Sequence, residues 1–194
     1  EDAFPFLLTR LTMKNGALKI AIAGSSGYTG GELYRILLHH PGVTVTAVTS
    51  EKSAGKPLTD IFPQFLGLTD LVCEPLDPEA IMKKAEFVFL ALPHVTAQAA
   101  AYRFHKLGVK VVDLSADYRL ADAAVYEQWY EHGHQYPDLL KSAVYGLPEL
   151  HRERIKKASL TANPGCYPTS AILGLAPALR NNLVDNGSIV VDSK

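Results

Sequence analysis

A glycine-spaced turn near the start of the chain constrains the fold more than any other sequence feature. Residues 18–23, LKIAIA, form a short apolar run typical of a buried strand, and a glycine follows it directly. Across residues 28–39 the apolar side chains recur at helical spacing, and a Pro-Gly pair then ends that helix. Residues 43–49 are rich in β-branched side chains and predict a second strand. The sequence therefore predicts a right-handed βαβ unit with glycines at its first turn.

The alternation of strands and helices continues along the chain. The patterns predict further strands at 71–74, 86–92, 109–114, 159–162 and 188–192, and helices at 78–85, 96–107, 125–131 and 167–180. The rest of 53–76 is expected to be irregular loop, and the prolines at 137 and 148 indicate turns. This alternation is typical of an α/β fold, a Rossmann-like and mostly parallel sheet with helices on both faces.

The length of the chain sets its domain organisation. Its 194 residues exceed the roughly 150 of a typical domain, which predicts one complete domain and the beginning of another. We expect an N-terminal extension at 1–17, a dinucleotide-binding domain at 18–162, and at 163–194 the start of an α+β catalytic and oligomerisation domain. Because the chain ends just after the last expected strand, this second domain is predicted to be incomplete. Met13 is an alternative natural start, which would make the residues before it an upstream extension.

Composition excludes several classes of protein. With 19 basic and 20 acidic side chains and 47% hydrophobic residues, the chain fits neither a disordered segment nor a nucleic-acid surface. No apolar run reaches the roughly 18 residues needed to cross a bilayer, and residues 1–12 lack the basic start of a secretory signal. Two cysteines are too few for a disulfide scaffold, so a reducing, cytoplasmic location is predicted.

The glycine turn has the position of a dinucleotide-binding loop. Its spacing is G-x-x-G-x-x-G rather than the standard G-x-G-x-x-G, but it lies directly between a strand and a helix. Glycines there let backbone N–H groups approach a pyrophosphate, which the helix N-terminus stabilises. A purely structural turn is the alternative. The candidate cofactor contacts are Gly24, Ser26, Gly27, Tyr28, Thr29 and Gly30.

The end of the second strand bears on the choice of cofactor. Domains that prefer NAD place an acidic residue there to hold the ribose 2′-hydroxyl. Here Ser50 and Lys52 can donate hydrogen bonds to a 2′-phosphate, whereas Glu51 would repel one if it pointed inward. These residues favour NADP(H), and a solvated Glu-Lys pair is the alternative.

Cys166 lies in a turn immediately before an apolar-periodic helix. Backbone donors and the helix dipole at such a position favour a thiolate, the nucleophilic form of cysteine. The alternative is a buried and inert cysteine, which is our interpretation of Cys73 in its strand-like surroundings.

The sequence resembles the N-acetyl-γ-glutamyl-phosphate reductases. The resemblance covers the chain from about Lys19 to its end and rests on five motifs in family order: Gly24-Ser-Ser-Gly-Tyr-Thr-Gly30, Leu90-Ala-Leu-Pro-His94, Asp113-Leu-Ser-Ala-Asp-Tyr-Arg119, Tyr145-Gly-Leu-Pro-Glu149 and Asn163-Pro-Gly-Cys-Tyr-Pro-Thr169. It implies NADPH-dependent reduction of N-acetyl-γ-glutamyl phosphate to the semialdehyde and phosphate in arginine biosynthesis. Cys166 would be the catalytic nucleophile that forms a thioester, and the enzyme would be a homo-oligomer, a dimer or tetramer.

Other motif residues receive weaker assignments. Leu92 and Pro93 end a strand and would line the nicotinamide side, while His94 either joins them or caps the next helix. The candidate substrate contacts are Ser115, Arg119, Glu149 and Asn163. For Arg119 the alternative is a structural ion pair with Asp113 or Asp117, and Glu149 is expected to order the loop beside the cysteine.

The histidines mark a departure from the family. Members resemble aspartate-semialdehyde dehydrogenases in having an acid/base histidine beyond the cysteine, in the second domain. All seven histidines here precede Cys166, so none of them takes that role. His132 and His134 lack a third ligand nearby, and no metal site is predicted. A related aspartate-semialdehyde dehydrogenase and a non-catalytic NADP-binding module remain alternatives to the reductase.

Overall fold

A single parallel sheet organises the chain. The structure, a computed structural model, describes residues 16–193, so most of the expected extension at 1–17 lies outside the described residues. Its seven strands are ordered β3-β2-β1-β4-β5-β7-β6, and every strand pairing in the sheet is parallel. The strands are β1 Leu18–Ala23, β2 Val43–Thr49, β3 Cys73–Glu74, β4 Phe87–Leu90, β5 Lys110–Asp113, β6 Val144–Tyr145 and β7 Leu160–Ala162.

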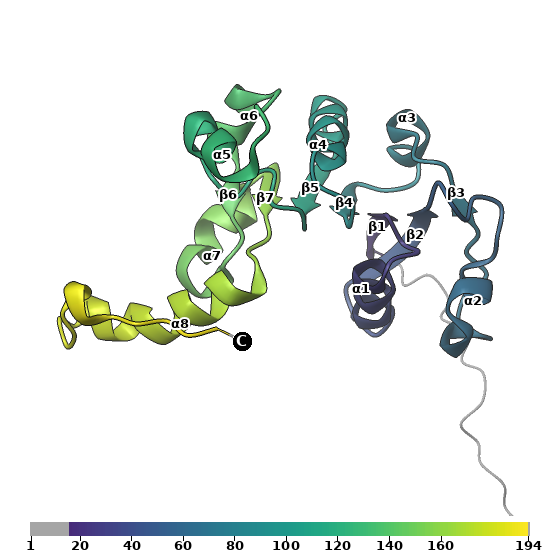
Figure 1. Cartoon of the computed structure of the whole chain (residues 1–194). Helices are drawn as coiled ribbons and strands as arrows, with labels where there is room; N and C mark the ends of the chain where they lie inside the picture. Colours follow the sequence, from purple (N-terminus) through teal and green to yellow (C-terminus); the bar gives the residue numbers. More distant parts are fainter. Residues whose placement is uncertain (1–15, 194) are drawn as a thin grey trace, which may run out of the picture.

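Helices cover both faces of the sheet. They are α1 Tyr28–Leu38, α2 Leu58–Ile61, α3 Pro78–Ile81, α4 Thr96–Lys106, α5 Ala123–Tyr130, α6 Pro137–Ser142, α7 Pro148–Lys157 and α8 Cys166–Arg180, with short 3-10 turns η1 Pro63–Phe65 and η2 Asn186–Ser188. Figure 1 shows α1 on one side of the sheet and α3, α4, α5 and α6 on the other. None of the helices within 16–193 is long and apolar enough to cross a membrane. The predicted Rossmann-like fold is confirmed.

Two apolar clusters pack against the two faces, because successive residues of a strand point to opposite sides. In β1, Ile20 and Ile22 join the cluster that includes Tyr34 of α1, whereas Ala21 and Ala23 join the one that includes Phe104 of α4. Strands covered on both faces read as continuous apolar runs, as the sequence of β1 does. The core therefore fixes β1 inside the sheet, between β2 and β4, with the glycine turn at its end.

Three parts of the chain differ from the sequence expectations. The prolines expected to mark turns instead begin α6 and α7, because proline suits the first turn of a helix, where its missing N–H has no helical partner. The segment expected to be mostly loop contains α2 and η1. The strand predicted at 188–192 was wrong: Val190 is 89% exposed, and this segment pairs with no strand among the described residues. Its β-branched run has strand propensity, but a strand also needs a neighbour.

Candidate functional site

The glycine turn follows β1, directly beside the end of the neighbouring strand β4. From this point the strand order runs outward in opposite directions, which is where open α/β sheets bind ligands. Gly24 follows β1 with a φ of +86°, and a Cβ on it would lie 2.2 Å from the carbonyl oxygen of Ala91, just beyond β4. Only glycine lets the two loops approach so closely.

The start of α1 forms a cradle of backbone donors. Its first helical hydrogen bond runs from the Gly31 N–H to the Gly27 carbonyl oxygen (2.9 Å), so the N–H groups of residues 28–30 face out of the helix start. Gly27 has no side chain to cap them, and a Cβ there would meet its nearest atom only at 3.8 Å. At Gly30 a Cβ would lie 2.5 Å from the Gly24 carbonyl oxygen, so glycine brings the helix against the turn. This open cradle fits a pyrophosphate.

Hydroxyl groups line the turn where β2 ends. The Ser26 and Ser50 hydroxyls lie 2.7 Å apart, and Ser50 also accepts a hydrogen bond from the Ser53 N–H. A carboxylate oxygen of Glu51 accepts a hydrogen bond from the Leu76 N–H (2.9 Å), which holds this side chain against the segment that leads to α3. Lys52 is exposed. The groups available for a ribose 2′-phosphate are therefore hydroxyls and an ammonium.

Cys166 is the first residue of α8 and is exposed, whereas Cys73 is buried, as expected for each. The helix begins cleanly because the Thr169 N–H and hydroxyl both donate to the Gly165 carbonyl oxygen (3.0 and 2.8 Å). Gly165, in extended conformation, caps the helix without a side chain. The Cys166 thiol thus lies at a helix N-terminus and is open to solvent, where a reactant can approach it.

Arg119 joins the loop after β5 to the loop that carries the cysteine. Its Nε donates to the Asn163 carbonyl oxygen (2.7 Å) and its Nη2 to the Leu114 carbonyl oxygen (2.9 Å). No ion pair with Asp113 or Asp117 is found in the part of the chain that the structure describes. Arg119 therefore contacts backbone carbonyls rather than carboxylates.

Ser115 lies inside the same loop after β5. It is 3% exposed, donates its hydroxyl hydrogen to Asp113 Oδ2 (2.7 Å) and accepts from the Asp117 N–H (3.0 Å). Asn163 is half-buried, and its side-chain amide donates to the Pro164 carbonyl oxygen. Substrate contact by these two residues stays a prediction.

Asp117, which the sequence interpretation considered only as an ionic partner, fixes the loop after β4. One carboxylate oxygen accepts from the Val95 N–H (2.8 Å) and the other from the Tyr126 hydroxyl (2.7 Å). Val95 has a φ of +69°, an unusual conformation for a β-branched residue, which this bond helps to hold. His94 Nδ1 accepts from the Ala116 N–H (3.1 Å), so the Leu92-Pro93 segment is held beside the loop after β5.

These contacts make one continuous edge. The loop after β1 touches the loop after β4 through Gly24, and His94 connects the loop after β4 to the loop after β5. Arg119 then connects that loop to the cysteine turn after β7. The glycine cradle and the Cys166 thiol therefore belong to the same rim of the sheet.

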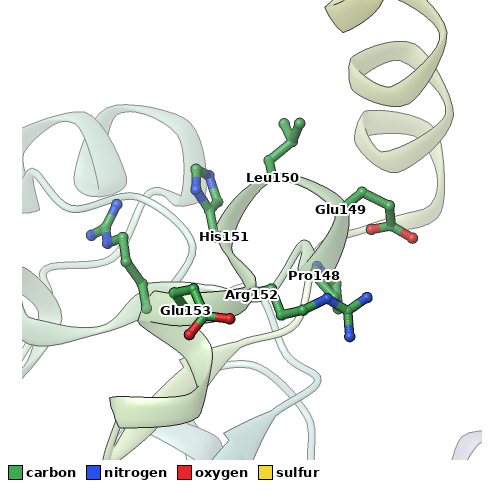
Figure 2. A pocket seen from close by; sticks show the side chains of 7 residues that line it. Pro148, Glu149, Leu150, His151, Arg152 and Glu153 are labelled. Carbon is green, nitrogen blue, oxygen red and sulfur yellow. The ribbon is translucent and has the colours of Figure 1, made fainter.

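Glu149 is exposed and lies in the first turn of α7, which follows β6, the strand that pairs with β7. The helix kinks at His151 (φ −129°, ψ 19°), and a shallow hollow of about 340 Å³ opens there, lined by residues 148–154. Figure 2 shows Glu149 and Leu150 projecting outward from this turn. Because the hollow is lined by one helix alone, it does not form a site with the rim, and the role predicted for Glu149 stays a prediction.

Asp113 gives the rim a pH-dependent stability. Burial raises the pKa of Asp113 to about 6, against the opposing hydrogen bonds from Ser115. A carboxyl whose pKa is higher in the folded chain than in the unfolded chain stabilises the folded chain while it is protonated. This contribution is complete below the pKa of the unfolded chain and is lost as the pH rises through about 6. We expect this group to lower the free energy of unfolding by about 1.4 kcal/mol between pH 5 and pH 7.5.

Urea denaturation of Asp113→Asn and of the unchanged chain at both pH values measures that contribution as a difference. The subtraction removes the effect of His134, whose pKa is lowered by burial and which acts in the opposite direction. The same pH dependence in both proteins would refute the assignment to Asp113.

Comparison with known proteins places these features in a family. The family described as "Semialdehyde dehydrogenase, NAD binding domain" matches residues 19–158. An N-acetyl-gamma-glutamyl-phosphate reductase of Geotalea daltonii is 58% identical over 177 residues, covering 91% of this chain and 51% of the relative. One from Moorella thermoacetica is 50% identical with the same coverage. The chain thus spans about half the length of the curated relatives it matches.

Solved structures show the same fold. An aspartate semialdehyde dehydrogenase with NADP from Candida albicans superposes with a TM-score of 0.65 at 18% identity, covering 85% of this chain and 47% of that one. Aspartate semialdehyde dehydrogenase II of Vibrio cholerae gives 0.59 at 19% identity, covering 84% of this chain and 47% of that one. At these identities the likeness extends to the fold alone.

Proposed function

The chain belongs to the semialdehyde dehydrogenase family through its NAD-binding domain, and from this premise we propose that it carries the cofactor turn and the nucleophile of an NADPH-dependent N-acetyl-γ-glutamyl-phosphate reductase. The observation that carries the proposal is the continuous rim that links the glycine cradle at α1 to the exposed Cys166 at α8. Identities of 50–58% to named reductases support the choice of substrate.

Cys166 supplies the first chemical step. Its thiolate attacks the acyl carbon of the acyl phosphate, a C–S bond forms, the bond from that carbon to the phosphate oxygen breaks, and phosphate leaves. N–H groups at the start of α8 are suited to stabilise the negative charge that develops on the acyl oxygen. The product of this step is a thioester on Cys166. When bound, NADPH supplies the hydride that reduces such a thioester to the aldehyde and returns the thiolate.

The other residues of the rim bind and orient. The N–H groups of residues 28–30 would hold the pyrophosphate, and Ser26, Ser50 and Lys52 the ribose 2′-phosphate. Leu92 and Pro93 would line the nicotinamide side, because the hydrogen bonds at His94 and Val95 fix their loop beside the glycine turn.

The change Lys52→Glu is expected to raise the Kd for NADP about tenfold and to leave the Kd for NAD almost unchanged, because only NADP carries the 2′-phosphate. Lys56→Glu is the matched control, since Lys56 is an exposed lysine of the same loop. Titration of both cofactors by calorimetry makes the comparison. Equal losses for NADP and NAD would contradict the proposed role of Lys52.

The reaction itself is tested in the reverse direction. N-acetylglutamate semialdehyde, NADP and phosphate are mixed with the protein, and the NADPH absorbance is followed with and without phosphate. A phosphate-dependent rise supports the reductase. A faster rise with aspartate semialdehyde would favour the related dehydrogenase, and NADPH binding without turnover would favour a non-catalytic module.

Three further features belong to the same proposal. The nucleotide-binding domain would end with β7 at Ala162, and residues 163–194, which begin with the cysteine turn, would start the second domain. In this part of the chain α8 has no buried residue and leads away from the sheet (Figure 1). The enzyme would be a homo-oligomer assembled through that second domain. It would act in the cytoplasm on a small acyl phosphate rather than on nucleic acid.

A further inference from the structure

The guanidinium of Arg119 connects two loops of the rim, and none of the proposed reaction steps uses this connection. It reaches from the loop after β5 to the loop after β7, and its two hydrogen bonds end on the carbonyl oxygens of Leu114 and Asn163. Asn163 is already tied to β5 through its own N–H, which donates to the Asp113 carbonyl oxygen (2.8 Å). The cysteine turn is therefore held at Asn163 through both its backbone N–H and its carbonyl oxygen.

The glycine before the cysteine makes room for this contact. A Cβ on Gly165 would lie 3.1 Å from Nη1 of Arg119, closer than side chains normally approach. The guanidinium therefore lies along the backbone of the residue that caps α8. Its planar fork suits two carbonyl oxygens at once, which a lysine ammonium on a flexible stem does not match.

We propose that Arg119 is a positioning residue, whose guanidinium fork fixes the Asn163-to-Cys166 turn and so places the Cys166 thiol at the start of α8. The inference rests on the proposed function in taking Cys166 as the nucleophile. It gives Arg119 a role through the backbone, while the direct substrate contact predicted from the sequence stays a prediction. The Arg119 charge also acts on two neighbours, Asp113 and Tyr145, where it opposes the larger rise in pKa that burial causes.

Two backbone amides report directly on the turn. The Asn163 N–H bonds to the Asp113 carbonyl oxygen and the Thr169 N–H to the Gly165 carbonyl oxygen. In Arg119→Leu we expect both amides to exchange with deuterium about tenfold faster, the change that corresponds to one lost charge-assisted hydrogen bond. The Val111 N–H, which bonds to the Ser159 carbonyl oxygen within the sheet, should keep its rate.

Alkylation by iodoacetamide at a fixed pH, located by peptide mass mapping, then measures the reactivity of the thiol itself. We expect both Arg119→Leu and Arg119→Lys to lower the alkylation rate of Cys166 severalfold, because a loosened turn no longer holds the thiol beside the N–H groups at the start of α8. The buried Cys73 serves as an internal control, since it reacts only if the chain unfolds. Arg35→Leu, which removes an exposed ion pair on α1, is the matched control and should change neither readout.

If Arg119→Leu exposes Cys73, the milder Arg119→Lys decides the question by the same two readouts. Wild-type exchange at Asn163 and Thr169 together with a wild-type alkylation rate of Cys166 in Arg119→Lys would overturn the proposal, because the charge alone would then suffice. Both readouts are taken without substrate or cofactor. The two readouts can therefore contradict the role of Arg119 while the reductase assignment stands, and they can support that role while the reductase assignment fails.

Discussion

The change Cys166→Ser is expected to abolish covalent acylation of the protein by an acyl phosphate, with a rate at least about a thousandfold lower than that of the unchanged chain. The cause is chemical: a serine hydroxyl is a much weaker nucleophile toward an acyl carbon at neutral pH than the sulfur of a cysteine. The readout is phosphate release from N-acetyl-γ-glutamyl phosphate, together with the acyl mass on the peptide that contains residue 166.

Cys73→Ala is the matched control for this experiment. Cys73 is 1% exposed, and its sulfur lies 3.6 Å from the Ser25 hydroxyl beneath the glycine turn. It should not react, so the alanine variant is expected to acylate at the rate of the unchanged chain. Acyl mass at residue 73, or undiminished acylation of Cys166→Ser, would refute the assignment of the nucleophile.

The change Gly24→Ala is expected to lower the free energy of unfolding by about 3 kcal/mol or more and to eliminate measurable NADP binding. Two effects add at this position, a φ of +86° and a Cβ 2.2 Å from the Ala91 carbonyl oxygen. The loop after β4 would have to move away from β1, which would displace the glycine turn proposed to hold the pyrophosphate.

Two other glycines separate the two effects. Gly55 has a φ of +84° with no atom within 4 Å of a Cβ, so Gly55→Ala measures backbone strain alone, about 1 kcal/mol. Gly30 has no such φ but a Cβ there would lie 2.5 Å from the Gly24 carbonyl oxygen, so Gly30→Ala measures the clash alone. Denaturation and NADP titration of the three variants should rank Gly24→Ala as the most damaging. An effect at Gly24 no larger than that at Gly55 would contradict the close approach of the two loops.

The elements that local patterns could predict are those with strong periodicity. The strand at 18–23, the helix that follows and the strand at 43–49 were predicted within a residue or two, because their apolar spacing and their Gly and Pro boundaries agree. The helix after the cysteine turn was predicted for the same reason, and its start at Cys166 is what brings the thiol to the helix end.

The elements that the patterns missed depend on neighbours distant in the sequence. A proline before a short helix has the same local signature as a proline in a turn, so α6 and α7 were not predicted. The run at 188–192 has strand propensity, but its pairing depends on whether a strand lies beside it.

The contacts of the rim were the hardest to predict. The sequence predicted that Arg119 contacts substrate, with an ion pair to an aspartate as the alternative. In the structure its partners are backbone carbonyls, which every residue has and no sequence pattern marks. The role of Asp117 in holding Val95 depends on the same kind of contact between distant loops.

The central claim is that the glycine cradle and Cys166 act as one site, and a single-turnover experiment tests it most directly. The protein is acylated on Cys166 by N-acetyl-γ-glutamyl phosphate, freed of phosphate and excess reagent, and mixed with NADPH. The account predicts that the acyl mass disappears from Cys166 as an equal amount of NADPH is oxidised and the semialdehyde appears. An acylated chain that binds NADPH but keeps its thioester, with no NADPH oxidised, would contradict it.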